Sequence, residues 1–275
     1  MSNYESPKDD QISSLIDHIF ERYGFDFRDY ACASLRRRVT AILRSERVDS
    51  IGALQERILA DSLAFQRFVH GISVSVTSMF RDPSFYAAFR TEIVPLLATY
   101  PFIRLWLAGC STGEEVYSVA IVLHEEGLYD RSRIYATDVD ILSVKAAEKG
   151  IFPLAGMKEY SANHLKSGGK HSLSTYYTAD AENALFRNHL KSNIVFAQHN
   201  LVCDASFNEF HVILCRNVLI YFNSALRERV LLLLHDSLIT FGVLGLGAKE
   251  SLRFCNVEPC YEQINLNEKL YRKVI

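Results

Sequence analysis

The residues best suited to chemistry lie in a turn of small residues, 108–113, that joins an apolar run to a helical pattern. The run at 103–107 has the length and composition of a buried strand, and from Val116 onward apolar residues recur at helical spacing. A strand, a glycine-bearing turn and a helix are how doubly wound α/β domains open a nucleotide pocket. The free N–H groups at the start of such a helix can donate hydrogen bonds to a ligand.

Two acids, Glu114 and Glu115, stand where this helix begins. The helix dipole favours acids at that end, which is a structural reason for their presence. They would repel a pyrophosphate, however, and the turn has only Gly109 and Gly113 instead of the pattern G-x-G-x-x-G. A ligand with an amino group and a cationic centre, such as S-adenosylmethionine, therefore fits better than a dinucleotide. Taken alone, the turn is also compatible with a plain strand-to-helix connection.

A further acid follows the next expected strand, 134–137. Asp138 stands 25 residues after Gly113, and an acid at the tip of the second strand is placed to accept hydrogen bonds from ribose hydroxyls. The alternative role for Asp138 is the N-cap of the helix expected at 141–149, but Asp140 suits that role better. We therefore expect Asp138 to hold a sugar and Asp140 to cap the helix.

The composition excludes several classes of protein. With 275 residues, 49% hydrophobic and 23% charged residues, the chain is typical of globular proteins. A formal net charge of −2 argues against a nucleic-acid partner, and no apolar run reaches the roughly 18 residues of a membrane span. The first ten residues are polar, unlike a signal peptide, and the six cysteines form no C-x-x-C pair. We expect a cytoplasmic protein without a metal site or membrane insertion.

The periodicity divides the chain into three parts. Apolar residues at helical spacing predict an all-helical unit over residues 1–75. Residues 76–98 are expected to form a linker and a connecting helix. Residues 99–275 alternate between strand and helix patterns and predict an α/β domain, which a hairpin at 260–274 closes.

One region interrupts this alternation. Short runs of β character at 174–178, 184–186 and 194–197 predict an inserted antiparallel subdomain at about 168–198. The last of these runs leads into Asn200 at the edge of the main sheet.

Five segments of the sequence, in the order in which they occur, resemble the motifs of the chemotaxis receptor methyltransferase family, CheR. The resemblance implies a fold class: an α/β, Rossmann-like S-adenosylmethionine-dependent methyltransferase sheet with a closing antiparallel hairpin, a small β-subdomain insertion and an all-α N-terminal domain. It implies methyl transfer from S-adenosylmethionine to glutamate side chains of chemoreceptors. The matching segments are 77–82 (TSMFRD), 108–118 (AGCSTGEEVYS), 136–140 (ATDVD), 200–201 (NL) and 215–222 (CRNVLIYF).

The resemblance also implies the site residues. Arg81 and Tyr221 lie at the acceptor and the transferred methyl group and are the catalytic candidates. Of the two acids at the turn, we favour Glu114 for the amino group of the cofactor, although the motif does not separate it from Glu115. The cofactor-binding candidates are Ser75, Thr77, Arg81, Gly109, Glu114, Glu115, Asp138, Asn200, Leu201, Arg216 and Asn217.

Arginines dominate one face of a helix expected at 35–47. Such a face is either a solvated surface or a docking surface for an acidic partner. The resemblance matches Arg36, Arg37 and Arg38 to the basic helix that meets the cytoplasmic helical bundle of chemoreceptors. Nothing in the chain demands a dimer, so we expect a monomer.

The expected chemistry needs no general base, because a glutamate with a pKa near ~4.3 is already an anion at neutral pH. Segment 177–184 is short and has no glycine, whereas family members that grip a C-terminal receptor pentapeptide have a longer, glycine-rich loop there. We therefore expect a pentapeptide-independent enzyme. The alternatives are a catalytically weak scaffold that binds S-adenosylmethionine in a signalling complex, a methyltransferase for nucleic acids or small molecules, and an NAD-dependent dehydrogenase.

Overall fold

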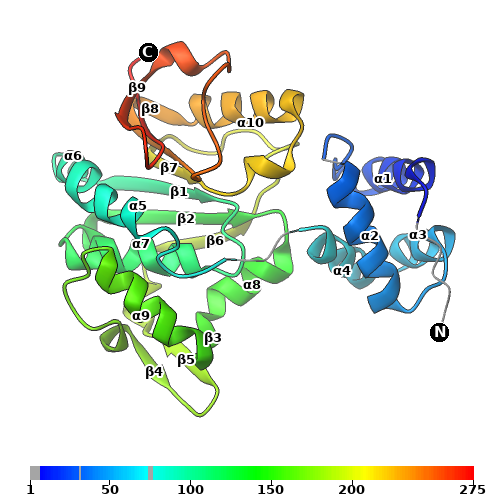
Figure 1. The fold of residues 1–275 in the computed structure, drawn as a ribbon, viewed down its shortest axis with the longest axis horizontal. Helices are drawn as coiled ribbons and strands as arrows, with labels where there is room; N and C mark the ends of the chain where they lie inside the picture. Colours follow the sequence, from blue (N-terminus) through cyan, green and yellow to red (C-terminus); the bar gives the residue numbers. More distant parts are fainter. Residues whose placement is uncertain (1–6, 31, 74–76) are drawn as a thin grey trace.

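The computed structural model describes residues 7–30, 32–73 and 77–275. A helical unit, blue in Figure 1, lies beside a larger unit that is built around a twisted sheet. None of the described helices combines the length and apolar character that crossing a bilayer requires.

Four helices form the N-terminal unit, and each turns its apolar face inward. In the first helix these residues are Ile12, Leu15, Ile16 and Ile19, which recur at the three- and four-residue spacing of one helix face. Asp61 caps the fourth helix through the backbone N–H groups of its first turn. The helices are α1 (Asp9–Tyr23), α2 (Cys32–Glu46), α3 (Ile51–Ala60) and α4 (Ser62–Ile72).

The larger unit has a seven-stranded sheet in the order β6-β2-β1-β7-β8-β10-β9. The first five strands in this order run parallel, and the last two form the expected antiparallel hairpin. The strands are β1 (Ile103–Ala108), β2 (Ser132–Asp138), β6 (Ile194–Gln198), β7 (Phe210–Cys215), β8 (Leu238–Leu246), β9 (Tyr261–Asn265) and β10 (Leu270–Lys273).

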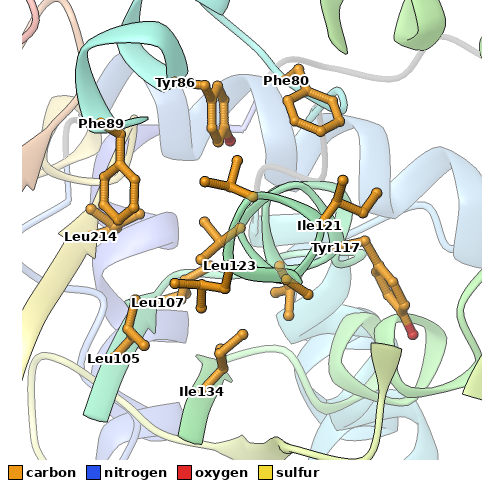
Figure 2. Close-up of a cluster of buried hydrophobic side chains, with 14 of the residues drawn as sticks. Phe80, Tyr86, Phe89, Leu105, Leu107, Tyr117, Ile121, Leu123, Ile134 and Leu214 are labelled. Atoms are coloured by element: carbon orange, nitrogen blue, oxygen red, sulfur yellow. The ribbon is translucent and has the colours of Figure 1, made fainter. Parts of the chain in front are cut away.

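Helices cover both faces of this sheet because alternate strand residues point to opposite sides. Leu105 and Leu107 of β1 pack in one core with α7 (Glu114–Glu125), whereas Trp106 packs in another core with α10 (Ser224–Asp236). Figure 2 shows the first core, where Leu123 lies beside Leu107 of β1. The helices of this unit are α5 (Pro83–Ala88), α6 (Val94–Leu97), α7 (Glu114–Glu125), α8 (Ile141–Lys149), α9 (Met157–Lys166) and α10 (Ser224–Asp236).

Short turns of helix complete the fold. The connecting helix expected within residues 76–98 is interrupted between α5 and α6 by a π-helical turn, η1 (Phe89–Ile93). The 3₁₀ turns are η2 (Tyr129–Arg131), η3 (Leu154–Gly156), η4 (Leu173–Tyr176), η5 (Asn188–Leu190), η6 (Leu219–Tyr221) and η7 (Glu258–Cys260).

The inserted subdomain differs from the prediction. Its three-stranded antiparallel sheet, in the order β3-β5-β4, consists of β3 (Ile151–Pro153), β4 (Tyr177–Ala179) and β5 (Asn183–Phe186). The expectation that residues 194–197 belong to it is wrong, because β6 pairs in parallel with β2 at the edge of the main sheet. An apolar run shows that a strand exists but not which sheet it joins, and a three-residue strand such as β3 is too short to show periodicity.

Candidate functional site

A cleft lies at the carboxyl ends of β1, β2 and β7, where the strand order reverses about β1. Open α/β sheets bind their ligands at such a switch point. Ser75 lies outside the described residues. Most of the other predicted site residues line the cleft: Thr77, Arg81, Gly109, Glu115, Asp138, Asn200, Leu201, Arg216, Asn217 and Tyr221.

The backbone conformation and close packing of the turn after β1 require glycine at two positions. Gly109 and Gly113 have φ of +80° and +98°, in the left-handed region that glycine tolerates best. A Cβ on Gly109 would lie 2.4 Å from Cγ2 of Val218, and one on Gly113 would lie 2.8 Å from Cβ of Ala147. The glycines therefore allow close packing of this turn against the loop after β7 and against α8.

Asp138 ties this turn to the end of β2. Its Oδ2 accepts a hydrogen bond from the Ser111 N–H (2.8 Å), and its Oδ1 accepts one from the Asp140 N–H (3.0 Å). Burial raises the pKa of Asp138. Because each carboxylate oxygen has two lone pairs, both oxygens keep capacity for a sugar hydroxyl.

Asp140 caps α8 as predicted, since its Oδ1 accepts from the Leu142 N–H at 3.0 Å. It also has a role that the sequence did not suggest: its Oδ2 lies 2.6 Å from Nδ1 of His70 on α4. This contact joins the helical unit to the sheet unit beside the cleft.

The two acids at the start of α7 point in different directions, because consecutive helical residues are about 100° apart. Glu115 lines the cleft and accepts hydrogen bonds from Arg216 (2.6 Å) and from the Tyr86 hydroxyl (3.3 Å). Glu114 is buried and accepts one from the Thr112 hydroxyl at 2.7 Å, and burial raises its pKa. It is not among the described residues that line the cleft, whereas Glu115 is. Which of the two acids holds the amino group of the cofactor stays a prediction.

Arg216 is the buried cation of the site. Its Nη1 lies 2.6 Å from Glu115, its Nη2 lies 2.9 Å from Asp82, and its guanidinium lies 3.9 Å from the ring centroid of Phe85. Its Nη2 also contacts the backbone carbonyl of Arg81 at 3.4 Å. Burial alone lowers the pKa of Arg216, but the neighbouring carboxylates outweigh that effect and raise it. Arg216 therefore joins the segment before α5, the start of α7 and the end of β7.

Glu250 is a buried acid that the sequence analysis missed. Its carboxylate accepts hydrogen bonds from the backbone N–H groups of Asn217 (2.9 Å), Leu219 (2.7 Å) and Gly247 (2.6 Å). It thus holds the loop after β7, where Asn217 has a φ of +62°, against the end of β8. Its position just after the last parallel strand was the available signal, because the carboxyl ends of parallel strands meet at one sheet edge.

The helical unit forms one wall of the cleft through Tyr30, Ser34 and Arg38, which the sequence analysis did not anticipate. A backbone bridge between Tyr30 and Phe222 holds this wall in place. Nη1 of Arg38 donates to the Ser73 carbonyl at 2.7 Å, and its guanidinium lies 5.7 Å from the ring centroid of Tyr221.

The three consecutive arginines of α2 consequently do not form one surface. Arg36 pairs with Asp9 of α1, Arg37 is exposed, and Arg38 lies in the cleft. This division follows from the 100° rotation per helical residue.

The cleft has two features of a ligand site. Left-handed φ values at residues other than glycine recur beside it, at Phe80, Asp82, Ser111 and Asn217, and such strain concentrates at functional sites. Buried polar atoms around it also have no hydrogen-bond partner within the described part of the chain: Oγ of Ser78, Oγ of Ser111, Nδ1 of His199 and Nε of Arg216. Buried polar atoms in folded proteins are normally paired, so these atoms fit a polar ligand such as S-adenosylmethionine.

The sheet is doubly wound and is closed by an antiparallel hairpin. The cleft at its carboxyl edge contains two carboxylates and a glycine turn. Together these features define the class of S-adenosylmethionine-dependent methyltransferases. Residues 75–269 match the family model described as CheR methyltransferase, SAM binding domain, and residues 10–73 match CheR methyltransferase, all-alpha domain. The chain belongs to the CheR methyltransferase family. The predicted family, fold class, enzyme class and cofactor are confirmed.

Curated relatives agree with this assignment. The chain is 44% identical to a putative methyltransferase, Cher3, of Pseudomonas putida, over 98% of each chain. It is 27% identical to a chemotaxis protein methyltransferase of Listeria innocua, over 83% of this chain and 85% of the relative. It is 28% identical to a chemotaxis protein methyltransferase of Salmonella typhimurium, over 78% of this chain and 74% of the relative.

Proposed function

We propose that this methyltransferase esterifies glutamate side chains of chemoreceptors. The observation that carries the proposal is the composition of the cleft, which is lined by Glu115 and Asp138 at the sheet edge and also by Arg38 and Tyr221, which lie next to each other. The two carboxylates suit the amino group and the ribose of the cofactor, and the Arg38 guanidinium suits an acceptor carboxylate.

S-adenosylmethionine, when bound, supplies an electrophilic methyl group on a sulfonium. The acceptor carboxylate is already an anion at neutral pH, so the chain has to orient it and keep water out. Arg81 and Arg38 line the cleft and can orient this carboxylate, and Tyr221 lies beside Arg38. Correct orientation alone can lower the barrier of such reactions by up to ~7–11 kcal/mol.

The acceptor is expected to be acidic and helical. Arg37 is exposed on α2 beside the wall that Arg38 forms, which suits the acidic cytoplasmic helical bundle of a chemoreceptor. We propose a cytoplasmic, monomeric enzyme that approaches this bundle with the helical unit and the mouth of the cleft.

The β-subdomain supports pentapeptide independence. The turn between β4 and β5 is tight, because Oδ1 of Asp180 accepts hydrogen bonds from the N–H groups of Glu182 (2.8 Å) and Asn183 (2.7 Å). This short connection leaves no long loop to close over a peptide. We expect calorimetry with a receptor C-terminal pentapeptide to detect no binding, and a complex of micromolar or tighter affinity would overturn this part of the proposal.

The main test is incubation with radiolabelled S-adenosylmethionine and receptor cytoplasmic fragments from the same organism, followed by base treatment. Volatile labelled methanol marks a carboxyl methyl ester and is the expected result. The control is Asp138→Ala, which we expect to release little methanol because the sugar contact is lost. Cofactor binding by the wild type without transfer to any receptor would favour the scaffold instead.

A further inference from the structure

The helical unit contacts the segment 138–140 of the sheet unit at two points. Nδ1 of His70 on α4 lies 2.6 Å from Oδ2 of Asp140, and Val139 packs against the hydrophobic core of the helical unit. α4 also packs beside α8, the helix that begins directly after Asp140 (Figure 1). Two of the three residues in this segment are therefore held by the helical unit, and the third, Asp138, lines the cleft.

The contact with His70 is a hydrogen bond to a buried carboxylate. The Asp140 side chain is completely buried, and because a carboxylate only accepts hydrogen bonds, Nδ1 of His70 carries the proton and donates it. Asp140 also accepts from the Leu142 N–H at 3.0 Å and from the Ser143 hydroxyl at 2.6 Å, both in α8. A buried charge needs such donors, and His70 supplies one from the helical unit.

Asp140 in turn orients the Asp138 carboxylate. The Asp140 N–H donates to Oδ1 of Asp138 at 3.0 Å, and the Ser111 N–H donates to its Oδ2 at 2.8 Å. The position of the Asp140 backbone therefore sets how Asp138 faces the cleft. His70 is not among the described residues that line the cleft, so it reaches this carboxylate through Asp140.

We propose that His70 is a positioning residue for the cofactor. By holding Asp140, it keeps the Asp138 carboxylate in the orientation that the ribose hydroxyls require, and a preorganised group costs less entropy when a ligand binds. The inference deepens the proposed function, because it rests on the sugar contact proposed there for Asp138. It gives the helical unit a part in binding S-adenosylmethionine as well as in forming the wall of the cleft.

The test is calorimetric titration of the full-length protein with S-adenosylmethionine. We expect His70→Ala to weaken binding about threefold to tenfold. His70→Asn should recover most of this loss, because its amide N–H can donate to Asp140 in place of Nδ1. The His70 side chain is 49% exposed, so its truncation leaves no core cavity, and urea unfolding checks that each variant is folded.

The matched control is His18→Ala, a second histidine of the helical unit. Nδ1 of His18 lies 2.6 Å from the carbonyl oxygen of Ser14 within α1, so its contact is local to one helix. This substitution should leave the affinity for S-adenosylmethionine unchanged. An equal loss in His18→Ala and His70→Ala would show that the effect is not specific to the contact with Asp140.

A double-mutant cycle determines whether His70 acts through Asp138. Asp138→Ala alone should weaken binding, and adding His70→Ala should weaken it no further, because the carboxylate that His70 positions is then absent. Additive losses contradict the proposal. So does a wild-type affinity in His70→Ala, or a failure of His70→Asn to recover binding.

These outcomes are separate from those that test the proposed function. The titrations need no acceptor, so they decide the role of His70 even if the wild type methylates no receptor. A wild-type affinity in Asp138→Ala would remove the proposed sugar contact together with the role of His70. If Asp138→Ala weakens binding and His70→Ala does not, only the role of His70 is lost.

Discussion

The two ends of α7 have the same composition and different surroundings. Glu114 and Glu115 stand at the start of the helix, and Glu125 and Glu126 stand at its end. At the start Glu115 pairs with the buried Arg216, and at the end both Glu125 and Glu126 pair with the buried Arg90. The helix dipole favours acids at the start but opposes them at the end, so the second cluster depends more on its cations.

Hydrogen bonding distinguishes the two arginines. Arg90 donates from Nε to the Ser167 carbonyl (3.1 Å), from Nη1 to Glu126 (2.8 Å) and from Nη2 to Glu125. Nε of Arg216, in contrast, has no partner within the described part of the chain. The cluster at the end of α7 is satisfied and closed, whereas the cluster at the start borders a cleft. This difference indicates that the cluster at the end of α7 serves stability and that the cluster at its start serves a ligand.

The largest expected effect comes from Arg90→Met. This change leaves Glu125 and Glu126 without their buried cation, and breaking a buried pair in this way costs about 3–5 kcal/mol. We expect the free energy of unfolding in urea to fall by that amount, while the affinity for S-adenosylmethionine of the folded fraction, measured by calorimetry, stays unchanged. An unchanged unfolding midpoint would show that this cluster does not support the fold.

Acid should weaken the closed cluster next. Burial alone raises the pKa of Glu125, but hydrogen bonds from His164 and Arg90 outweigh burial and lower it to about 2. A depressed pKa adds stability above the unfolded value near ~4.5, and this contribution is lost as the pH falls toward about 2. The shift corresponds to about 3 kcal/mol at most.

The measurement is urea unfolding between pH 6 and pH 2, for the wild type and Glu125→Gln. The wild type should lose stability more steeply than the variant across the lower part of this range. Equal slopes in the two proteins would contradict the assigned pKa of Glu125.

Arg216→Met should affect activity more than stability, which is the opposite of what we expect for Arg90→Met. Of its partners, Glu115 lines the cleft and the Asp82 side chain is 40% exposed, so water can solvate both and we expect a smaller loss of stability. Turnover should fall about a hundredfold, which is the usual effect of removing a preorganised electrostatic group from an active site by mutation. Both unfolding and methyl transfer are measured, and an effect confined to stability would make this cluster structural like the other.

The sequence predicted the parts of the site that depend on local signals. Gly109 and Asp138 stand at the ends of adjacent strands, and the strand-turn-helix order alone places them near each other. The position of Arg38 depends on how α2 docks against the sheet unit, and its neighbours at the cleft are remote in sequence. Glu250 likewise acts on a loop that is 33 residues away, through hydrogen bonds to backbone groups that sequence patterns do not report. Local sequence patterns therefore identified the cleft. The roles of Arg38 in its wall and of Glu250 in the loop that borders it could be found only from the tertiary structure.

The finest test separates the two acids at the start of α7. Glu115→Gln removes the charge that lies on the cleft beside Arg216, so the affinity for S-adenosylmethionine should fall about tenfold, which is ~1.4 kcal/mol. Glu114→Gln is a matched control one residue away. Because Glu114 is buried against Thr112 and its pKa is raised by burial, a neutral amide in its place should leave affinity within about twofold of the wild type. Calorimetry measures both, and a larger loss in Glu114→Gln would reverse the assignment and return Glu114 to the cofactor.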